Sequence, residues 1–261
     1  MEPKRFYYII RLQFLGFRYS GWQKQPGQRT IEGMLQKTLK FVLSERKFKI
    51  LGAGRTDAKV SALDSAFELF LEDEPLTNLP DFLVLINTNL PPDIRALEIT
   101  ETNRSFNIIR DSKAKEYRYL FSFGEKNHPF CAPFLTNVIT HLDIALMVEA
   151  ASLFEGNHDF SAYTARLQPN TKVVRTITSC KIVPNTLLSA NFFPEKSFAL
   201  IVKGEGFMRY QIRMIMGALF QLGKGELSIA DIKASLRSDS NMKLTTVAPG
   251  SGLMLNAVIF E

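Results

Sequence analysis

Short apolar strand patterns and amphipathic helix patterns alternate along this chain in two successive series, and that order limits the fold more than any other feature. In the first series, strand patterns lie at 6–14, 48–51, 66–71 and 94–99, and helix patterns lie at 31–42 and 80–87. In the second series, strand patterns lie at 117–123, 173–183, 198–203 and 253–260, and helix patterns begin at Asp143, Phe207 and Ser228. Strands followed by packed helices, twice, predict an α+β fold of two similar halves with largely antiparallel, mixed sheets flanked by helices.

We expect the two halves to meet at a linker near residues 101–105, which gives an N-terminal domain at 1–104 and a C-terminal domain at 105–261. A length of 261 residues is sufficient for two domains of roughly 130 residues each. Hydrophobic residues make up 46% and charged residues 22%, as in ordinary globular proteins. No run approaches the roughly 20 apolar residues of a membrane span, so we expect no membrane association.

Cysteine, histidine and the first residues indicate a cytoplasmic protein without a metal site. Cys131 and Cys180 are far apart in sequence and lack Cys-x-x-Cys spacing, which favours buried free thiols in a reducing compartment. The three histidines are scattered, so neither a metal cluster nor a catalytic triad is predicted. Residues 1–5 contain no apolar stretch of the kind found in signal peptides.

The segment Gly52-Ala53-Gly54-Arg55-Thr56-Asp57 places an arginine and a carboxylate on a turn directly after a strand pattern. Gly52 and Gly54 tolerate backbone angles that other residues avoid, so we expect a sharp turn that a bulky ligand can approach. Asp57 would then be displayed from a rigid support as a reactive carboxylate. The alternatives are a surface ion pair between Arg55 and Asp57, a helix cap, or a phosphate-binding turn, although the Lys-Ser/Thr ending of a P-loop is missing.

The helix predicted at 207–222 is apolar on nearly every face, yet it carries Arg209 and Arg213 one turn apart on the same side. A buried guanidinium without a partner costs roughly 3–5 kcal/mol, so Arg213 should pair with a carboxylate. That carboxylate is either a structural Glu or Asp of the core, or Asp57 itself.

Two further segments indicate contact with RNA. Tyr117 begins a strand of alternating aromatics beside Lys113, Lys115 and Arg118, where its ring could stack on an unpaired base, whereas Tyr119, Phe121 and Phe123 are expected in the core. The loop at 16–25 mixes glycine, aromatic, amide and cationic residues, which suits an irregular RNA surface. Trp22 could equally pack against the core and tie this loop down. A net charge of +6 agrees with an anionic partner.

Six segments, in this order along nearly the whole chain, resemble the motifs of the TruA-type tRNA pseudouridine synthases. They are 19–23 (Tyr-Ser-Gly-Trp-Gln), 54–57 (Gly-Arg-Thr-Asp), 87–94 (Asn-Thr-Asn-Leu-Pro, then Asp-Ile), 117–119 (Tyr-Arg-Tyr), 156–160 and 206–213. The resemblance implies the pseudouridine synthase fold, with an active-site cleft between the halves. It further implies a homodimer that uses neither a metal nor an organic cofactor.

The resemblance also implies the reaction and the residues that carry it. Uridine would be isomerised to pseudouridine in the anticodon stem-loop of tRNA, at positions 38, 39 and/or 40, after the target nucleotide has flipped out. Asp57 would be the nucleophile, and Arg55 would enter the RNA stem. Tyr117 would stack on the target base or transfer a proton, and Arg213 would pair with the nucleophile. The predicted RNA contacts are Arg55, Arg18, Trp22, Gln23, Lys24, Lys59, Arg110 and Arg209.

The chain departs from the family pattern at positions that concern RNA contacts. After the Arg-Thr-Asp motif, Lys59 stands where bacterial members have glycine, and Ser61 stands where they have histidine, as in some eukaryotic relatives. Near Phe106, the usual Phe-His-Ala-Arg is replaced by Phe-Asn-Ile-Ile, and Arg110 comes one place late. Leu15 replaces an acidic residue of the first loop. These changes bear on which uridines are modified rather than on the chemistry.

Three other functions fit parts of the sequence. The scaffold could serve a catalytically silent RNA-binding or folding factor, although such a factor has no need of Asp57, Tyr117 and Arg213 together. A synthase acting on a different RNA is a second alternative. A nucleotide enzyme that binds phosphate at Gly52 and Gly54 is the third.

Overall fold

The division between the two halves of the chain lies later than the sequence predicts. In the computed structural model, which describes residues 4–44, 46–165, 167 and 170–260, unit 1 comprises Met1–Lys113 with Leu255–Glu261, and unit 2 comprises Ala114–Met254. The predicted boundary at residue 104 therefore moves to Lys113, and the end of the last strand belongs to unit 1. Two observations explain why residues 105–113 belong to unit 1. Ile108 is buried, and Lys113 N donates a hydrogen bond to Ile259 O at 2.8 Å.

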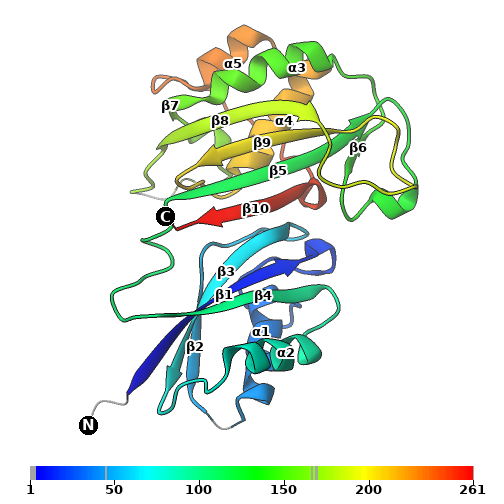
Figure 1. Ribbon diagram of the computed structural model, residues 1–261. Coiled ribbons are helices and arrows are strands. Elements are labelled where there is room, and N and C mark those ends of the chain that lie inside the picture. Colours follow the sequence, from blue (N-terminus) through cyan, green and yellow to red (C-terminus); the bar gives the residue numbers. More distant parts are fainter. Residues whose placement is uncertain (1–3, 45, 166, 168–169, 261) are drawn as a thin grey trace. The chain divides into compact units, whose positions relative to one another are not determined.

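Unit 1 is one antiparallel sheet with two helices on one of its faces (Figure 1). Its strands are β1 (Arg5–Phe14), β2 (Phe48–Gly52), β3 (Ser61–Glu72), β4 (Ile94–Thr102) and β10 (Leu253–Ile259), and its helices are α1 (Ile31–Val42) and α2 (Leu79–Asn89). The strand order is β4-β1-β3-β10, and β2 also pairs with β3.

Strand register and helix capping explain why unit 1 forms these elements. Tyr8 lies opposite Leu69 and Ile10 opposite Phe67, so the apolar residues of β1 and β3 share the face on which the helices pack. Helix α1 starts where predicted, since the Thr30 side chain accepts a hydrogen bond from Gly33 N. The apolar stripe of that helix is buried against the sheet, which makes this face the core of unit 1.

Unit 2 contains five further strands and three helices. Its strands are β5 (Ala114–Phe123), β6 (Thr136–Val138), β7 (Gly156–Asp159), β8 (Val174–Pro184) and β9 (Phe198–Gly204), and its helices are α3 (Ile144–Ala151), α4 (Gln211–Gly223) and α5 (Ile229–Ser235). The order β5-β9-β8-β7 is antiparallel, and the short β6 pairs with β5 in parallel. Short 3₁₀ turns lie at Gly16–Arg18 in unit 1 and, in unit 2, at Pro129–Cys131, Ser152–Phe154, Ser161–Tyr163 and Gly250–Gly252. The predicted fold class, mixed helices and largely antiparallel strands, is confirmed.

Helix α4 begins four residues later than predicted. Tyr210 has a left-handed backbone (φ 66°), which ends the preceding turn, and the Gln211 side chain accepts a hydrogen bond from Met208 N at 2.8 Å. Arg209 therefore lies ahead of the helix rather than on it. The rest of α4 is buried on nearly all sides, as predicted, and the Phe220 ring packs edge-on against Tyr119.

Two compositional predictions can be compared with the structure. Cys131 and Cys180 are buried free thiols, which confirms the prediction for them. Within the described ranges, no helix is both long enough and apolar enough to cross a membrane.

Candidate active site

The Arg-Thr-Asp motif lies on a loop between β2 and β3. Gly52 pairs with Phe67, and Ala53 N donates a hydrogen bond to Ala66 O at 2.9 Å, so the loop leaves the sheet at a fixed point. Arg55 is exposed and Asp57 is half-buried. The loop thus presents its cation to solvent and its carboxylate in a partly dehydrated setting.

The first loop of the chain clamps this motif on both flanks of Asp57. Trp22 N donates to Thr56 O at 3.0 Å on one side, and Lys59 N donates to Tyr19 O at 3.0 Å on the other. Two backbone hydrogen bonds from one loop, placed either side of the carboxylate, restrict its backbone. A catalytic group needs this kind of support from its surroundings.

Gly52 makes room for a side chain rather than for an unusual backbone angle. Neither Gly52 nor Gly54 has a positive φ. A Cβ on Gly52 would lie 2.5 Å from two ring carbons of Trp22, so this glycine makes room for the indole. The left-handed position of the loop is occupied by Lys59, whose φ is 67°. The chain bends at residues 53–54, as expected, and turns again at residues 58–59, where Val60 N donates to Asp57 O at 3.2 Å.

Trp22 packs in the core of unit 1. Its ring is only 3% exposed, and it contacts the Phe14 ring with centroids 6.3 Å apart. Trp22 therefore ties the first loop to the core, which is the second of the two roles expected for it. A buried ring cannot stack on a base, so the structure does not support its predicted contact with RNA. Gln23 and Lys24 are exposed, and their side chains donate to Glu32 and Gln36 of α1 at 2.8 Å each.

A charged network supports the outer side of the first loop. Asp93 accepts hydrogen bonds from Arg18 Nη2 at 2.8 Å and from the Tyr19 hydroxyl at 2.5 Å. Arg29 donates to the same hydroxyl at 3.2 Å and lies over the Tyr19 ring at 4.9 Å. Burial raises the pKa of Asp93, but the hydrogen bonds from Tyr19 and Arg18 outweigh it and leave the pKa below its usual value.

This network contains two residues that the sequence did not single out as functional. Arg29 directly precedes the helix cap Thr30. Asp93 follows two prolines within segment 87–94, which resembles a family motif but has no role assigned to it. A basic residue next to a helix start, with an acidic one after a Pro-Pro pair, is too weak a signal on its own. Only the fold brings them together, and it leaves the predicted RNA contact Arg18 exposed but paired with Asp93.

In unit 2, Tyr117 lies half-buried near the start of β5. The Phe207 ring meets it edge-on with centroids 5.4 Å apart. Lys115 is two residues earlier and so on the same face of the strand, and its burial lowers the pKa of its amine. Tyr119 and Phe121 are fully buried, as expected, whereas Phe123 is half-buried.

Arg213 is held near the start of α4. Its Nε donates to Ala248 O at 2.7 Å, and its own carbonyl accepts from Ala248 N at 3.0 Å. The guanidinium groups of Arg213 and Arg209 each lie 4.9 Å from the Tyr210 ring centroid. One aromatic ring thus orients both arginines, although only Arg213 is on the helix.

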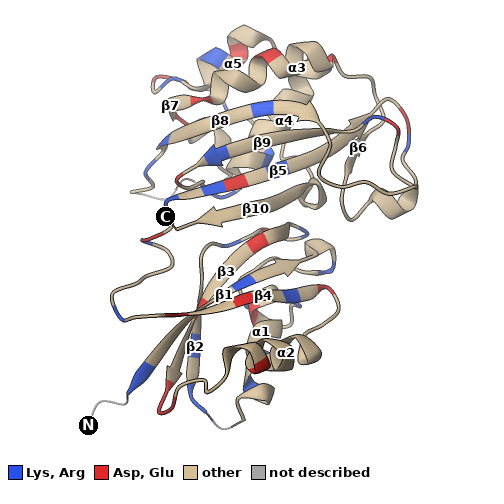
Figure 2. Ribbon diagram, viewed as in Figure 1, with Lys and Arg blue, Asp and Glu red and all other residues tan. Residues whose placement is uncertain are grey.

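Basic side chains extend beyond these residues. Figure 2 shows lysines and arginines along β5, β8 and β9 of unit 2 and on β1 and β2 of unit 1. Among the described residues, no group of three or more His, Cys, Asp or Glu side chains could hold a metal ion.

Comparison with known proteins identifies the family. The model of a family described as tRNA pseudouridine synthase matches residues 150–261. Over 262 aligned residues, the chain is 32% identical to the tRNA pseudouridine synthase A of Thermodesulfovibrio yellowstonii, with 96% of this chain and 98% of that protein covered. The chain belongs to the tRNA pseudouridine synthase family. It is 30% identical to proteins of the same name from Shouchella clausii (95% and 91% covered) and Lysinibacillus sphaericus (96% and 98% covered).

Membership of this family makes the chain an isomerase, and the structure explains two of its departures from the usual motif. The glycine that is common after Arg-Thr-Asp-Ala is replaced in this synthase by Lys59, and the backbone keeps the left-handed angle that glycine favours. The Lys59 amine lies 5.6 Å from the centroid of the Phe17 ring. Ser61, at the usual histidine position, accepts a hydrogen bond from Gly16 N at 2.9 Å.

Each unit of the synthase therefore holds part of the predicted site. Unit 1 brings Arg55, Asp57 and Lys59 onto one loop and clamps that loop with residues 16–22. Unit 2 holds Tyr117, Arg209 and Arg213 through aromatic contacts. Arg110 lies in unit 1 on a separate turn at 107–111.

Proposed function

We propose that the protein converts uridine to pseudouridine in the anticodon stem-loop of tRNA, at positions 38, 39 and/or 40, with Asp57 as the catalytic carboxylate. The observation that carries this proposal is the clamp around Asp57, in which Trp22 N and Lys59 N hold the loop on either side of a half-buried carboxylate. The relatives named tRNA pseudouridine synthase A support the choice of tRNA as substrate.

The reaction is a rearrangement that needs one well-placed carboxylate. The C1′–N1 glycosidic bond breaks, the uracil turns, and a C1′–C5 bond forms, while C5 loses a proton and N1 gains one. Asp57 stabilises or traps the sugar or the base while the uracil is detached. Partial burial suits this role, because a less hydrated carboxylate interacts more strongly with developing positive charge.

The target uridine must leave the helical stack before it can react. Unstacking costs a few kcal/mol, which the protein offsets with new contacts. Arg55 is exposed on the same loop as Asp57, so its side chain is free to enter the space that the base vacates. Phosphate contacts from the basic side chains supply the rest of the binding free energy.

Tyr117 and Arg213 take the roles that the resemblance implies. Tyr117 stacks on the target base or transfers a proton, and its edge-on contact with Phe207 supports a fixed ring orientation. Arg213 is the partner of the catalytic carboxylate, and its bond to Ala248 O supports a preset guanidinium. A fixed guanidinium favours the ionised form of a carboxylate.

The test is to incubate the wild-type protein and an Asp57→Asn variant with tRNA transcripts and to map pseudouridine by position. We expect pseudouridine at positions 38–40 with the wild type and none with the variant, and tRNA affinities within about threefold of each other. The matched control is Asp73→Asn, the same exchange at an exposed carboxylate of unit 1 whose left-handed backbone suits asparagine.

Three outcomes separate the alternatives. Equal pseudouridine levels in wild type and Asp57→Asn would remove Asp57 from the chemistry. Tight tRNA binding without any product from the wild type would favour the silent RNA-binding factor. Product in other cellular RNAs but not in tRNA would favour a synthase with a different substrate.

We also propose that the protein works in the cytoplasm as a homodimer, as the resemblance implies. Light scattering on the purified protein would then give the mass of two chains. The mass of a single chain at working concentration would contradict the dimer and leave the reaction untouched.

A further inference from the structure

Glu68 is a buried carboxyl group without a basic partner. It lies on β3, is 0% exposed, and takes part in no ion pair among the described residues. Its Oε2 accepts a hydrogen bond from Ile108 N at 3.2 Å. Its Oε1 is also buried and has no hydrogen-bond partner in the described part of the chain. Natural cores rarely keep such a group unless it has a purpose.

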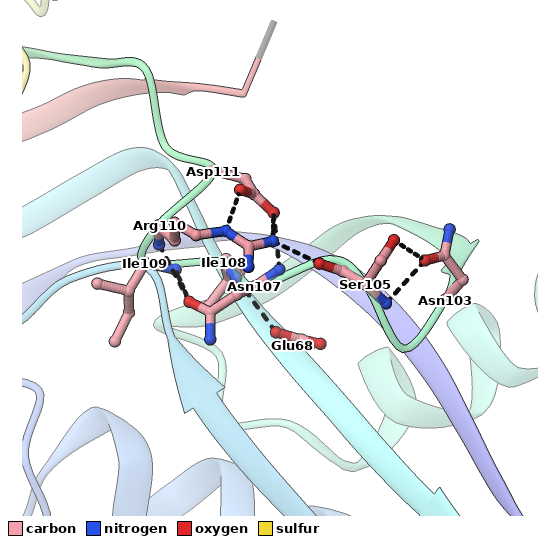
Figure 3. Close-up of polar contacts among 8 residues, drawn as sticks. All are labelled: Glu68, Asn103, Ser105, Asn107, Ile108, Ile109, Arg110 and Asp111. Carbon is pink, nitrogen blue, oxygen red and sulfur yellow. Dashed lines mark hydrogen bonds and ion pairs between the residues drawn. The ribbon is translucent and has the colours of Figure 1, made fainter.

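The purpose is suggested by what Glu68 holds. Ile108 lies on a turn, residues 107–111, that its own side chains tie together (Figure 3). Asn107 Oδ1 accepts from Ile109 N at 3.1 Å and from Arg110 N at 3.0 Å, and Asn107 N donates to Asp111 at 2.8 Å. The bond from Ile108 N to Glu68, forty residues earlier, joins this self-contained turn to the sheet.

Arg110 projects from this turn with its guanidinium oriented. Its side chain is 67% exposed, yet Nε and Nη2 each donate to Asp111, at 2.8 and 2.9 Å, and Nη2 also donates to Ser105 O. The second terminal nitrogen, Nη1, makes no hydrogen bond among the described residues. Arg110 is therefore a cation held in one direction with donors left over, which suits a phosphate oxygen.

The same stretch of β3 supports the catalytic loop. Glu68 pairs with Leu51, Phe67 pairs with Gly52, and Ala66 O accepts from Ala53 N at the start of the Asp57 loop. Three consecutive residues of one strand thus anchor both the loop of the proposed catalytic carboxylate and the turn of an exposed arginine.

We propose that Glu68 is a positioning residue that sets the place of Arg110 relative to the catalytic loop, so that Arg110 meets the RNA backbone of a tRNA whose uridine is at Asp57. The inference rests on the proposed function. An apolar residue at position 68 would leave Ile108 N without an acceptor, whereas a carboxyl group supplies one from inside the sheet. Burial and the nearby charge of Asp111 both raise the pKa of the Glu68 carboxyl group.

The experiment compares steady-state kinetics on tRNA for Glu68→Ala, Glu68→Gln, Arg110→Ala and the double variant Glu68→Ala/Arg110→Ala. We expect Glu68→Ala to raise KM about fivefold with kcat within about twofold, and Glu68→Gln, whose amide oxygen can still accept from Ile108 N, to restore KM. In the double variant, KM should equal that of Arg110→Ala alone, because Glu68 acts through Arg110.

Two controls keep the result interpretable. Asn107→Ala loosens the same turn from the surface without opening the core, so a raised KM is expected even if Glu68→Ala fails to fold. Glu72→Ala removes another carboxylate from the same face of β3, one that pairs with Arg5, and should leave KM unchanged.

The inference is overturned if the effects of Glu68→Ala and Arg110→Ala multiply in the double variant. It is equally overturned if Glu68→Gln is as impaired as Glu68→Ala, or if Asn107→Ala leaves KM unchanged. A wild-type protein that forms no pseudouridine would instead refute the proposed function. In that case tRNA affinity replaces KM in the same comparison.

Discussion

Ser61 Oγ accepts a hydrogen bond from the buried backbone N–H of Gly16 at 2.9 Å, and this contact joins the end of the Asp57 loop to the start of the first loop. We predict that Ser61→Ala lowers the free energy of unfolding by about 1–3 kcal/mol, because Gly16 N–H stays buried without an acceptor. Product formation should also slow, since the Asp57 loop loses an anchor. Urea unfolding and single-turnover rates measure the two effects.

The matched control for Ser61 is Ser20→Ala. Ser20 is in the first loop too, but its hydroxyl donates to the Gln28 side chain at the surface, so the change in unfolding free energy should stay within about 0.5 kcal/mol. A loss as large for Ser20→Ala as for Ser61→Ala would show that the Gly16 contact is not what stabilises the loop.

Lys59→Gly should separate folding from RNA binding. The backbone at residue 59 is left-handed, so glycine relieves strain of about 1 kcal/mol but adds a similar entropy to the unfolded chain, and stability should change little. Loss of the cation should weaken tRNA binding and reduce the salt slope of log Kd by about one. Titrations at several salt concentrations measure this, with Lys40→Ala on the exposed side of α1 as control. An unchanged salt slope would remove Lys59 from the RNA contacts.

Asp93→Asn should destabilise the protein in a pH-dependent way. The pKa of Asp93 is below its ordinary value of 3.8 in the folded protein, so its ionised form contributes stability above pH 3.8 that is lost as the pH falls through the folded pKa. At pH 7 the variant should lose about 1–3 kcal/mol of unfolding free energy, the usual value of hydrogen bonds to a charged group. Denaturation at pH 7 and pH 3 should show the difference shrinking at the lower pH.

The exposed Arg237–Asp239 pair of unit 2 is the control for this prediction. Its guanidinium nitrogen and carboxylate oxygen are 2.8 Å apart, the same distance as in the Arg18–Asp93 pair. Both side chains of the Arg237–Asp239 pair, however, are largely exposed to solvent. Asp239→Asn should therefore leave stability unchanged at both pH values. If Asp93→Asn behaves like Asp239→Asn, the network around Tyr19 does not stabilise the first loop.

Glu68 should give the opposite pH dependence. Burial raises its pKa above 4.5, with Asp111 adding to the shift, so the folded protein keeps this proton longer than the unfolded chain does. The wild type should then lose stability as the pH rises from about 4.5 through the folded pKa, and Glu68→Gln should not. On the same side of the sheet, Arg11 pairs with Asp64 and Arg5 pairs with Glu72. Urea unfolding from pH 4.5 to 8 measures the difference. Parallel curves would show that the pKa of Glu68 is the same in the folded and unfolded protein.

Most elements of the fold could be predicted because their signals are local. Thr30 and Asp143 each accept a hydrogen bond from the backbone three residues later, and such caps are visible in the sequence. Apolar alternation predicts strands at 48–51 and 94–99, and β2 and β4 lie there with slightly later ends. The sequence predicts helix α4 four residues too early, because its start depends on the left-handed backbone of Tyr210 and on the Gln211 side chain. Hydrophobic periodicity reports neither of them.

The parts of the site that the sequence did not predict depend on contacts between distant segments. Trp22 is buried because Gly52, thirty residues later, leaves space for its ring. Glu68 lies within a strand that the apolar pattern predicts, and its special position arises only when Ile108 covers it. The residues of the Arg-Thr-Asp motif could be singled out, but the clamp around them could not, since it consists of backbone hydrogen bonds.

The return of Leu255–Glu261 to unit 1 has a consequence for how the protein is made. Val258 O accepts a hydrogen bond from Arg11, the Phe260 ring packs on Phe106, and β10 lies beside β3. The ribosome must synthesise all of unit 2 before it supplies this strand. During translation, part of one edge of β3 therefore stays uncovered until β10 is made. Unit 1, which carries the Asp57 loop, is completed last although most of its residues emerge first.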